Sequence, residues 1–544
     1  MKAIRSRVAL AILGALVYGC GNVSGGRATL GAGQTSLHLH DHLADAAVEA
    51  SPVPAEDREK IEWTFEAGAD AWQAVPANVA VGRTNLDRRN GVLGVVIGPQ
   101  NIWRGGALTR ALVYAPVPDL DRADWGALVV RARVRGNVQI IHPFYNVRAN
   151  APPGDPLRLR ADSVGRTMPF WATVPTLNHS PGVTLSRDSA VHTYRLPIPL
   201  TTPGPRDPQW IGPIREIGLI VGSNNGAVSP AGQIDLHSVT LERRGAEFAD
   251  SAIGSRDIDR EGVLRPSLYT HAPSRLRWRV RVPGGANLGV ALTTHDARSP
   301  VTFTVTVSSR SGDTTVFREV VNDATTWQER GIDLAAFAGQ TVELALGTQS
   351  SRPGQIAFWG SPILSGAPSA SANRSRPPNV IVFVIDGGGA DLMSLYGYNR
   401  RTTPNLDHLS AEGVVFERAH SNAAWTKPST ASFMTGLQHS ALGGFRGYGD
   451  QIPEAAPTMG QRFHDAGYQT AVFTFHANAG RGSALNRGVD RFQDNNGPGQ
   501  PFVESARFLT AAFWGWRAAF PGSPYWAHFQ VTDVHEPQIT LPPF

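Results

Sequence analysis

An aspartate and a threonine in the last third of the chain are placed for ester chemistry. Residues 380–385 form an unbroken apolar run, mostly β-branched, which predicts an interior parallel strand, and Asp386 follows at its carboxyl end. Ligands of open α/β sheets bind beyond these ends, so a carboxylate there can hold a metal or a substrate. Thr426 shortly precedes Pro428 and a helix-compatible segment, which predicts a helix start. The positive end of such a helix favours an anionic ester beside the threonine hydroxyl.

The segments around these two residues resemble the sulfatase family of the alkaline phosphatase superfamily. The resemblance covers about the last third of the chain, and it implies an α/β domain that hydrolyses sulfate or phosphate esters with a divalent metal, which could be Ca²⁺, Mg²⁺, Mn²⁺ or Zn²⁺. Besides the strand with Asp386, the matching segments are YGY at 396–398, TPNL at 403–406, EGVVF at 412–416, WTKPS at 425–429 with TG at 435–436, AGYQTA at 466–471, NAGR at 478–481 and DVHEP at 533–537.

Carried over position by position, the resemblance assigns Asp386 as a metal ligand, Thr426 as the nucleophile and His535 as a contact to the ester group. Lys427, beside the nucleophile, could also bind the anionic substrate. Other roles remain open: Asp386 could cap the following turn, Thr426 could cap its helix, His535 could make structural hydrogen bonds and Lys427 could be solvated. His476 belongs to no motif that assigns it a role.

The chain departs from the sulfatase pattern at three positions. Family members carry Cys or Ser in C/S-x-P-S-R, where this chain reads TKPST, so Thr430 replaces the arginine, and Gly387 replaces a second aspartate. Threonine is not converted to formylglycine, and no formylglycine is expected. A covalent sulfate or phosphate ester formed on threonine cannot collapse to an aldehyde, so water or an acceptor alcohol must attack it. Phosphate or phosphodiester hydrolysis and phosphoryl transfer are therefore favoured, with sulfate ester hydrolysis still open, and a metal would lower the pKa of the Thr426 hydroxyl.

The end of the chain at Phe544 affects the metal prediction. In the family, a second group of metal ligands follows the DVHEP region, so we expect an α/β domain that is truncated at its C-terminus, from a truncated product, a split reading frame or a degenerate relative. Asp386 alone offers too few ligands for a tight catalytic metal. The alternative function is a non-catalytic, glycan-binding surface lipoprotein with an incomplete sulfatase-like domain.

Residues 1–20 resemble a bacterial lipoprotein signal, with a basic start, a short apolar run and the sequence VYGC. Cys20, the single cysteine, is the expected lipid acceptor, although an ordinary signal peptide with an incidental cysteine is the alternative. Gly21 implies outer-membrane sorting, so we expect an exported protein anchored to the bacterial envelope, facing the periplasm or the cell surface. Residues 21–58 predict a flexible tether. Its histidines at 38, 40 and 42 could bind a metal weakly, but a solvated polar run is favoured.

Two β-sandwiches are predicted before the α/β domain. Residues 59–250 and 251–366 show period-two alternation with Gly and Pro between the strands. The first resembles jelly-roll carbohydrate-binding modules and the second resembles galactose-binding-like modules. Trp103, Trp171 and Trp210 could stack on sugars or belong to the core. Residues 367–378 are a predicted linker, and 379–544 the sulfatase-like α/β domain.

Composition fits a folded, multidomain protein. The chain has 544 residues, 41% hydrophobic and 17% charged, which is enough for several cores. The formal net charge of +5 is small for this length and does not call for a nucleic-acid partner. The expected partners are a sulfate or phosphate ester, on a glycan or a lipid, and the membrane that a lipid on Cys20 would enter.

Overall fold

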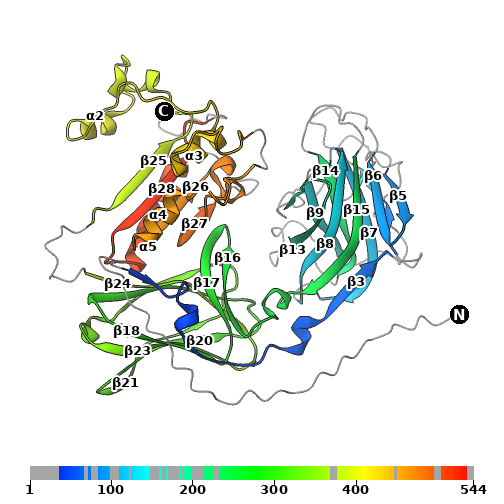
Figure 1. The fold of residues 1–544 in the computed structure, drawn as a ribbon, viewed down its shortest axis with the longest axis horizontal. Coiled ribbons are helices and arrows are strands. Elements are labelled where there is room, and N and C mark those ends of the chain that lie inside the picture. Colours follow the sequence, from blue (N-terminus) through cyan, green and yellow to red (C-terminus); the bar gives the residue numbers. More distant parts are fainter. Residues whose placement is uncertain are drawn as a thin grey trace.

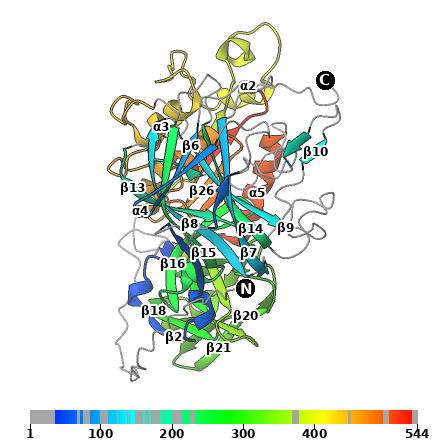
Figure 2. The ribbon, with the colours of Figure 1, turned by 90° about the vertical axis from the view of Figure 1, so that its right-hand side faces the viewer.

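The protein is represented by a computed structural model with three bodies: two β-sandwiches and a C-terminal α/β unit (Figure 1). The second sandwich lies below the other two bodies in this view and also in the view turned by 90° (Figure 2). Cys20, Trp103, Trp171 and Trp210 lie outside the described residues. The structure describes residues 36–65, 71–74, 84–97, 109–121, 124–136, 138, 140–147, 159–161, 167–169, 183–186, 188–198, 214–223, 232–367, 377–445, 450–494 and 504–535.

The first sandwich encloses its core between two antiparallel sheets, with orders β13-β8-β15-β6-β5 and β12-β9-β14-β7-β4, and β3 pairs with β15. Alternation of buried and more exposed residues along β8 buries Leu128, Val130 and Ala132. The strands are β3 (Lys60–Thr64), β4 (Gln73–Ala74), β5 (Thr84–Arg89), β6 (Val92–Ile97), β7 (Thr109–Leu120), β8 (Trp125–Gly136), β9 (Ile140–Val147), β12 (Val183–Thr184), β13 (Val191–Pro197), β14 (Ile214–Ser223) and β15 (Gly232–Arg243), with a separate hairpin of β10 (Leu159–Ala161) and β11 (Thr167–Pro169).

The second sandwich packs a five-stranded sheet, β2-β18-β23-β20-β21, against part of a larger sheet. Its core contains the fully buried rings of Trp278, Phe303 and Trp359. The strands are β1 (Ser36–His38), β2 (Ala47–Ala50), β16 (Ile253–Arg260), β17 (Val263–His271), β18 (Ser274–Arg281), β19 (Gly284–Thr294), β20 (Val301–Ser309), β21 (Gly312–Val321), β22 (Gln328–Asp333), β23 (Thr341–Ser350) and β24 (Ile356–Ala367).

The prediction of a flexible tether over residues 21–58 is wrong for the part that the structure describes, residues 36–58. Here β1 pairs with β24 and β2 pairs with β18, so both segments belong to the second sandwich. Leu37 and Leu39 are buried in its core. The strands are short and their partners lie far along the chain, so local periodicity did not reveal them.

The α/β unit shares a sheet with the second sandwich. The strand order is β22-β19-β24-β17-β27-β26-β28-β25, with β1 added to β24 and β16 to β17. The junction is the antiparallel pairing of β17 with β27 (Arg491–Asp494), which joins Val263 to Gln493 and Leu264 to Phe492. The two bodies are therefore continuous through backbone hydrogen bonds.

Beyond this junction the sheet is parallel and covered by helices on both faces, which confirms the α/β class of the C-terminal domain. Phe473 and Phe529 pack against α5 on one face, whereas Val472 and Trp526 pack with residues of α3 and α4 on the other. None of the helices in the described part of the chain has the length and apolar character that a membrane crossing requires. The elements are β25 (Val380–Ile385), α2 (Pro404–Ser410), α3 (Thr426–Thr435), α4 (Met459–Asp465), β26 (Gln469–Thr474), α5 (Ser505–Ala519) and β28 (Tyr525–Val531).

The strand before Asp386 is parallel as predicted, but it is not interior. Among the described strands, β25 pairs with β28 alone and forms the edge of the sheet. Ile381 is 51% exposed and Phe383 is 48% exposed. An apolar run shows that both faces of a strand suit burial, but the number of neighbouring strands depends on the order of strands in the sheet.

A glycine in β19 allows α5 and its C-terminal end to pack closely on the second sandwich. A Cβ atom at Gly289 would lie 2.2 Å from Cδ1 of Phe520. We expect Gly289→Ala to lower the free energy of unfolding by about 1–3 kcal/mol, because a tightly packed ring must shift. Gly284→Ala, on the same strand with nothing within 4 Å of its Cβ, is the matched control. Urea unfolding of the full chain measures both, and equal midpoints would contradict the prediction.

A buried histidine in β28 makes the α/β unit sensitive to acid. His528 is fully buried, and burial lowers its pKa to about 4. The unfolded chain binds a proton here below pH ~6.5, but the folded protein does not until about pH 4, so stability falls as the pH decreases through this window. The loss approaches about 3 kcal/mol. His528→Asn should flatten the dependence of melting temperature on pH, and the exposed His420→Asn should not; parallel curves for His528→Asn and wild type would refute this.

Candidate active site

The parallel strands bring three polar side chains to one edge of the sheet. Asp386 follows β25, His476 lies two residues after β26, and His535 lies shortly after β28. Carboxyl ends of neighbouring parallel strands share an edge, and this is where open α/β sheets bind ligands. The expectation that Asp386 stands at such an end is confirmed.

Thr426 faces this aspartate from the first residue of α3, so the predicted helix start is confirmed. The N-cap is Trp425 in an extended conformation, without a side-chain cap. Thr426 Oγ1 instead donates to Asp386, at 3.1 Å from Oδ2 and 3.4 Å from Oδ1. The structure thus favours a hydroxyl that interacts with the carboxylate over one that caps the helix.

Strand β28 fixes the position of Asp386. The Asp386 amide donates to Val531 O at 2.9 Å, and Gln530 Nε2 donates to Asp386 Oδ2 at the same distance. The Asp386 side chain is 13% exposed, which leaves the carboxylate accessible at the surface of the site. Sequence reasoning did not anticipate Gln530, because its role depends on which strand pairs with β25.

His476 joins the site although no motif indicated it. Its Nδ1 accepts the Asn478 amide at 3.2 Å, so the neutral ring carries its proton on Nε2, which lies 3.7 Å from Asp386 Oδ2. Burial lowers the pKa of His476, with Asp386 opposing this and His535 adding to it. The rings of His476 and His535 are 5.0 Å apart. The available signal was the apolar segment AVF at 471–473 just before it, which is typical of a buried strand.

Gly387 occupies the position of the second aspartate in the sulfatase pattern. Its φ is +77°, and a Cβ there would lie 3.2 Å from the Cα of His535. A residue with a side chain would be strained in this left-handed conformation and crowded by the segment after β28. Gly387 therefore suits the left-handed backbone at this position and supplies no second carboxylate.

Lys427 lies in a different environment from the one predicted for it. Its side chain is buried, and Nζ donates to Asp450 O at 2.8 Å and to Gly482 O at 3.5 Å. Burial lowers its pKa, with Asp450 opposing the shift. These contacts hold the start of α3 against neighbouring loops, so the placement favours a structural role over contact with the ester.

The site can contribute to holding a divalent metal. Asp386, His476 and His535 each offer a ligand atom, all within 4.8 Å of one another. Asp386 supplies the charge that a cation requires, and His535 can supply an imidazole nitrogen. His476 fits less well, because Nδ1 already accepts a hydrogen bond and Nε2 therefore carries the proton.

The C-terminal part of the chain is similar in sequence to known sulfatases. Residues 378–510 match the family model for Sulfatase. The chain is 36% identical over 74 residues to N-acetylgalactosamine-6-sulfatase of Canis lupus familiaris, covering 14% of each chain. It is 30% identical over 109 residues to N-acetylglucosamine-6-O-sulfatase of Bacteroides thetaiotaomicron, covering 20% of this chain and 19% of that one. It thus matches only a small part of the length of these curated relatives. A phosphonate monoester hydrolase of Agrobacterium radiobacter has a TM-score of 0.26 and 18% identity, with 30% of this chain and 43% of that chain covered.

The match of residues 378–510 to the Sulfatase model, which agrees with the parallel sheet, defines the class of the C-terminal domain. It is an α/β domain of the alkaline phosphatase superfamily. Within that superfamily, the C-terminal part of this chain belongs to the sulfatase family.

Proposed function

We propose that the α/β unit cleaves phosphate or sulfate esters, with Thr426 as the nucleophile. The observation that carries this proposal is the hydrogen bond from Thr426 Oγ1 to the Asp386 carboxylate at the start of α3. The sulfatase-family match supports an ester of a tetrahedral oxyacid, and the relatives are named for sulfate esters of N-acetylated sugars. The threonine favours phosphate, because its covalent ester must be released by an incoming nucleophile.

In the first step, Thr426 Oγ1 attacks phosphorus or sulfur while its proton moves toward Asp386, the acceptor that it already contacts. The bond from phosphorus or sulfur to the leaving oxygen breaks, and that oxygen takes a proton from water, which leaves a hydroxide. In the second step, this hydroxide attacks phosphorus or sulfur and the bond to Thr426 Oγ1 breaks. Thr426 takes back the proton from Asp386, and phosphate or sulfate is released. An acceptor alcohol in place of water would make the enzyme a transferase.

The remaining groups would stabilise negative charge. The positive end of α3 lies where the anionic ester would sit, and the Nε2–H of neutral His476 can donate to an ester oxygen. A divalent metal held by Asp386 and His535 would, when bound, polarise the ester and lower the pKa of the attacking hydroxyl. In the exported, lipid-anchored form predicted from Cys20, the site would meet esters of envelope glycans or lipids.

The direct test is to trap the covalent ester. Full-length protein is incubated with 4-nitrophenyl phosphate, 4-nitrophenyl sulfate or bis(4-nitrophenyl) phosphate in Mg²⁺, Mn²⁺, Ca²⁺, Zn²⁺ or EDTA, quenched in acid and digested. We expect turnover that EDTA abolishes, faster for phosphate than for sulfate, and an adduct on the peptide that contains Thr426. An adduct on another residue would overturn the nucleophile assignment, and no turnover under any condition would overturn the proposed function.

A further inference from the structure

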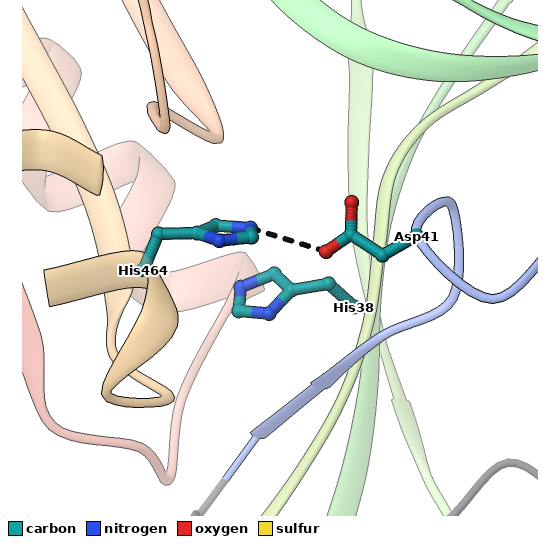
Figure 3. A group of neighbouring side chains, drawn as sticks. All are labelled: His38, Asp41 and His464. Atoms are coloured by element: carbon teal, nitrogen blue, oxygen red, sulfur yellow. Dashed lines mark ion pairs between the residues drawn. The ribbon is translucent and has the colours of Figure 1, made fainter. Parts of the chain in front are cut away.

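Three histidines and two aspartates meet where the N-terminal segment crosses the α/β unit. His38, His40 and Asp41 lie at the end of β1 and just after it, His464 lies in α4, and Asp490 directly precedes β27. Figure 3 shows the His464 ring from α4 beside His38 and Asp41 of the N-terminal segment. The five side chains form what we call the histidine cluster, which is built from residues that the proposed catalytic mechanism does not use.

The backbone of this segment is fixed. Strand β1 pairs with β24, and the Leu39 amide donates to Pro362 O at 2.9 Å. Because Leu37 and Leu39 enter the core of the second sandwich, the alternating side chains of His38 and His40 face the opposite way, toward the α/β unit. The histidines are therefore positioned in advance and do not depend on a mobile loop.

The donor atoms are spaced like metal ligands. Zinc bonds of about 2.0–2.2 Å in a tetrahedron place neighbouring ligand atoms roughly 3.3–3.6 Å apart. His464 Nε2 lies 3.4 Å from Asp41 Oδ2 and 3.9 Å from Asp490 Oδ1. His38 Nε2 lies 3.2 Å from Asp490 Oδ2, and His40 Nε2 lies 3.5 Å from Asp41 Oδ1. Two sets of three ligand atoms, both including His464, lie within 4.8 Å of one another.

Two buried atoms of the cluster lack hydrogen-bond partners in the described structure: His40 Nδ1 and Asp490 Oδ1. The Asp490 side chain is fully buried, and His40 is 8% exposed. Buried polar atoms are costly to leave unsatisfied, so a bound ligand at this place would be favourable.

We propose that the histidine cluster binds a divalent transition metal, for which Zn²⁺ is the best match. Imidazole nitrogens with one or two carboxylate oxygens suit Zn²⁺, whereas Ca²⁺ and Mg²⁺ prefer oxygen ligands. His464 is the shared ligand. The metal would join three segments that are distant in the sequence, and it would clamp residues 36–41 onto the α/β unit. This site is separate from the Asp386 site and its function does not depend on ester cleavage.

The test measures zinc itself. Full-length protein carrying Asp386→Asn, to remove the other candidate site, is stripped with EDTA and titrated with ZnCl₂ by calorimetry. We expect one zinc per chain and a higher melting temperature. His464→Gln and, separately, His40→Gln should each weaken zinc binding by roughly 100-fold or more, since loss of even an outer partner costs 10–100-fold. The exposed His408→Gln in α2 is the control and should bind zinc unchanged.

A second readout is the visible spectrum with CoCl₂, in which a tetrahedral nitrogen and oxygen site gives intense bands that both ligand variants should lose. Circular dichroism shows whether each variant is folded. If His464→Gln does not fold, His40→Gln still tests the proposal. Failure of the folded parent protein to take up zinc would overturn the proposal, leaving a hydrogen-bonded His–Asp cluster. Uptake that persists at parental affinity in the folded variants would overturn it as well.

Discussion

Thr426→Ala is expected to lower the rate of ester cleavage by roughly a thousandfold or more, because removal of a catalytic nucleophile abolishes the covalent route. The hydroxyl is held by Asp386 at 3.1 Å, and no other hydroxyl donates to that carboxylate among the hydrogen bonds of the described residues. Thr426→Ser keeps the nucleophilic atom and should retain measurable turnover and the trapped adduct. The measurement is the initial rate of 4-nitrophenyl phosphate hydrolysis, together with the mass of the quenched protein.

Ser429→Ala provides the matched control for this substitution. Ser429 lies in α3, and its hydroxyl exchanges a hydrogen bond with Ser421 at 2.8 Å, away from Asp386. Its removal should leave the rate within about twofold, since exposed hydrogen bonds contribute little. Equal rates for wild type and Thr426→Ala would show that threonine is not the nucleophile, whatever the activity of the control.

Glu329→Gln is expected to lower the free energy of unfolding by about 3–5 kcal/mol, because it leaves buried guanidinium groups without a countercharge. Glu329 on β22 contacts Arg265 on β17, whose side chain is fully buried, and it accepts from Arg491 Nε on β27 at 3.0 Å. Burial lowers the pKa of Arg265 to about 10. Burial acts to raise the pKa of Glu329, but the two arginines outweigh it and the net shift is downward.

This ion network links the second sandwich to the α/β unit, so its loss should be visible in urea unfolding of the full chain. Glu319→Gln is the control, because Glu319 pairs with Arg330 in a more exposed setting, at 2.6 Å with 26% and 37% of the side chains exposed. That change should cost less than about 1 kcal/mol. If the two variants unfold at the same urea concentration, the buried network does not stabilise the junction as argued.

Local patterns predicted the strand end and the helix start whose contact the proposed chemistry requires, but not the contact itself. The apolar run before Asp386 indicated a parallel strand, and Pro428 indicated the helix start at Thr426; the structure brings these two ends together. His476 was missed, because its position follows from the order of β26 and β28 and no local pattern encodes that order.

Non-local pairing explains the errors. The segment that includes His38 has strands of three and four residues, too short for a reliable period, and its partners β24 and β18 are far away in sequence. The edge position of β25 depends on which strands are its neighbours, and its apolar composition carries no information on their number.

The pairing of β17 with β27 has a consequence for how this protein can be divided. A protease that cut between residues 367 and 377 would break the chain but would not separate its products, since the β17–β27 pairing and the Glu329 ion network would still hold them together. Recombination at that boundary would likewise not deliver an independent catalytic module. Without the second sandwich, the edge of β27 that pairs with β17 would be exposed, and a different neighbouring domain would have to provide a strand for it. The second sandwich and the α/β unit are therefore expected to be inherited together.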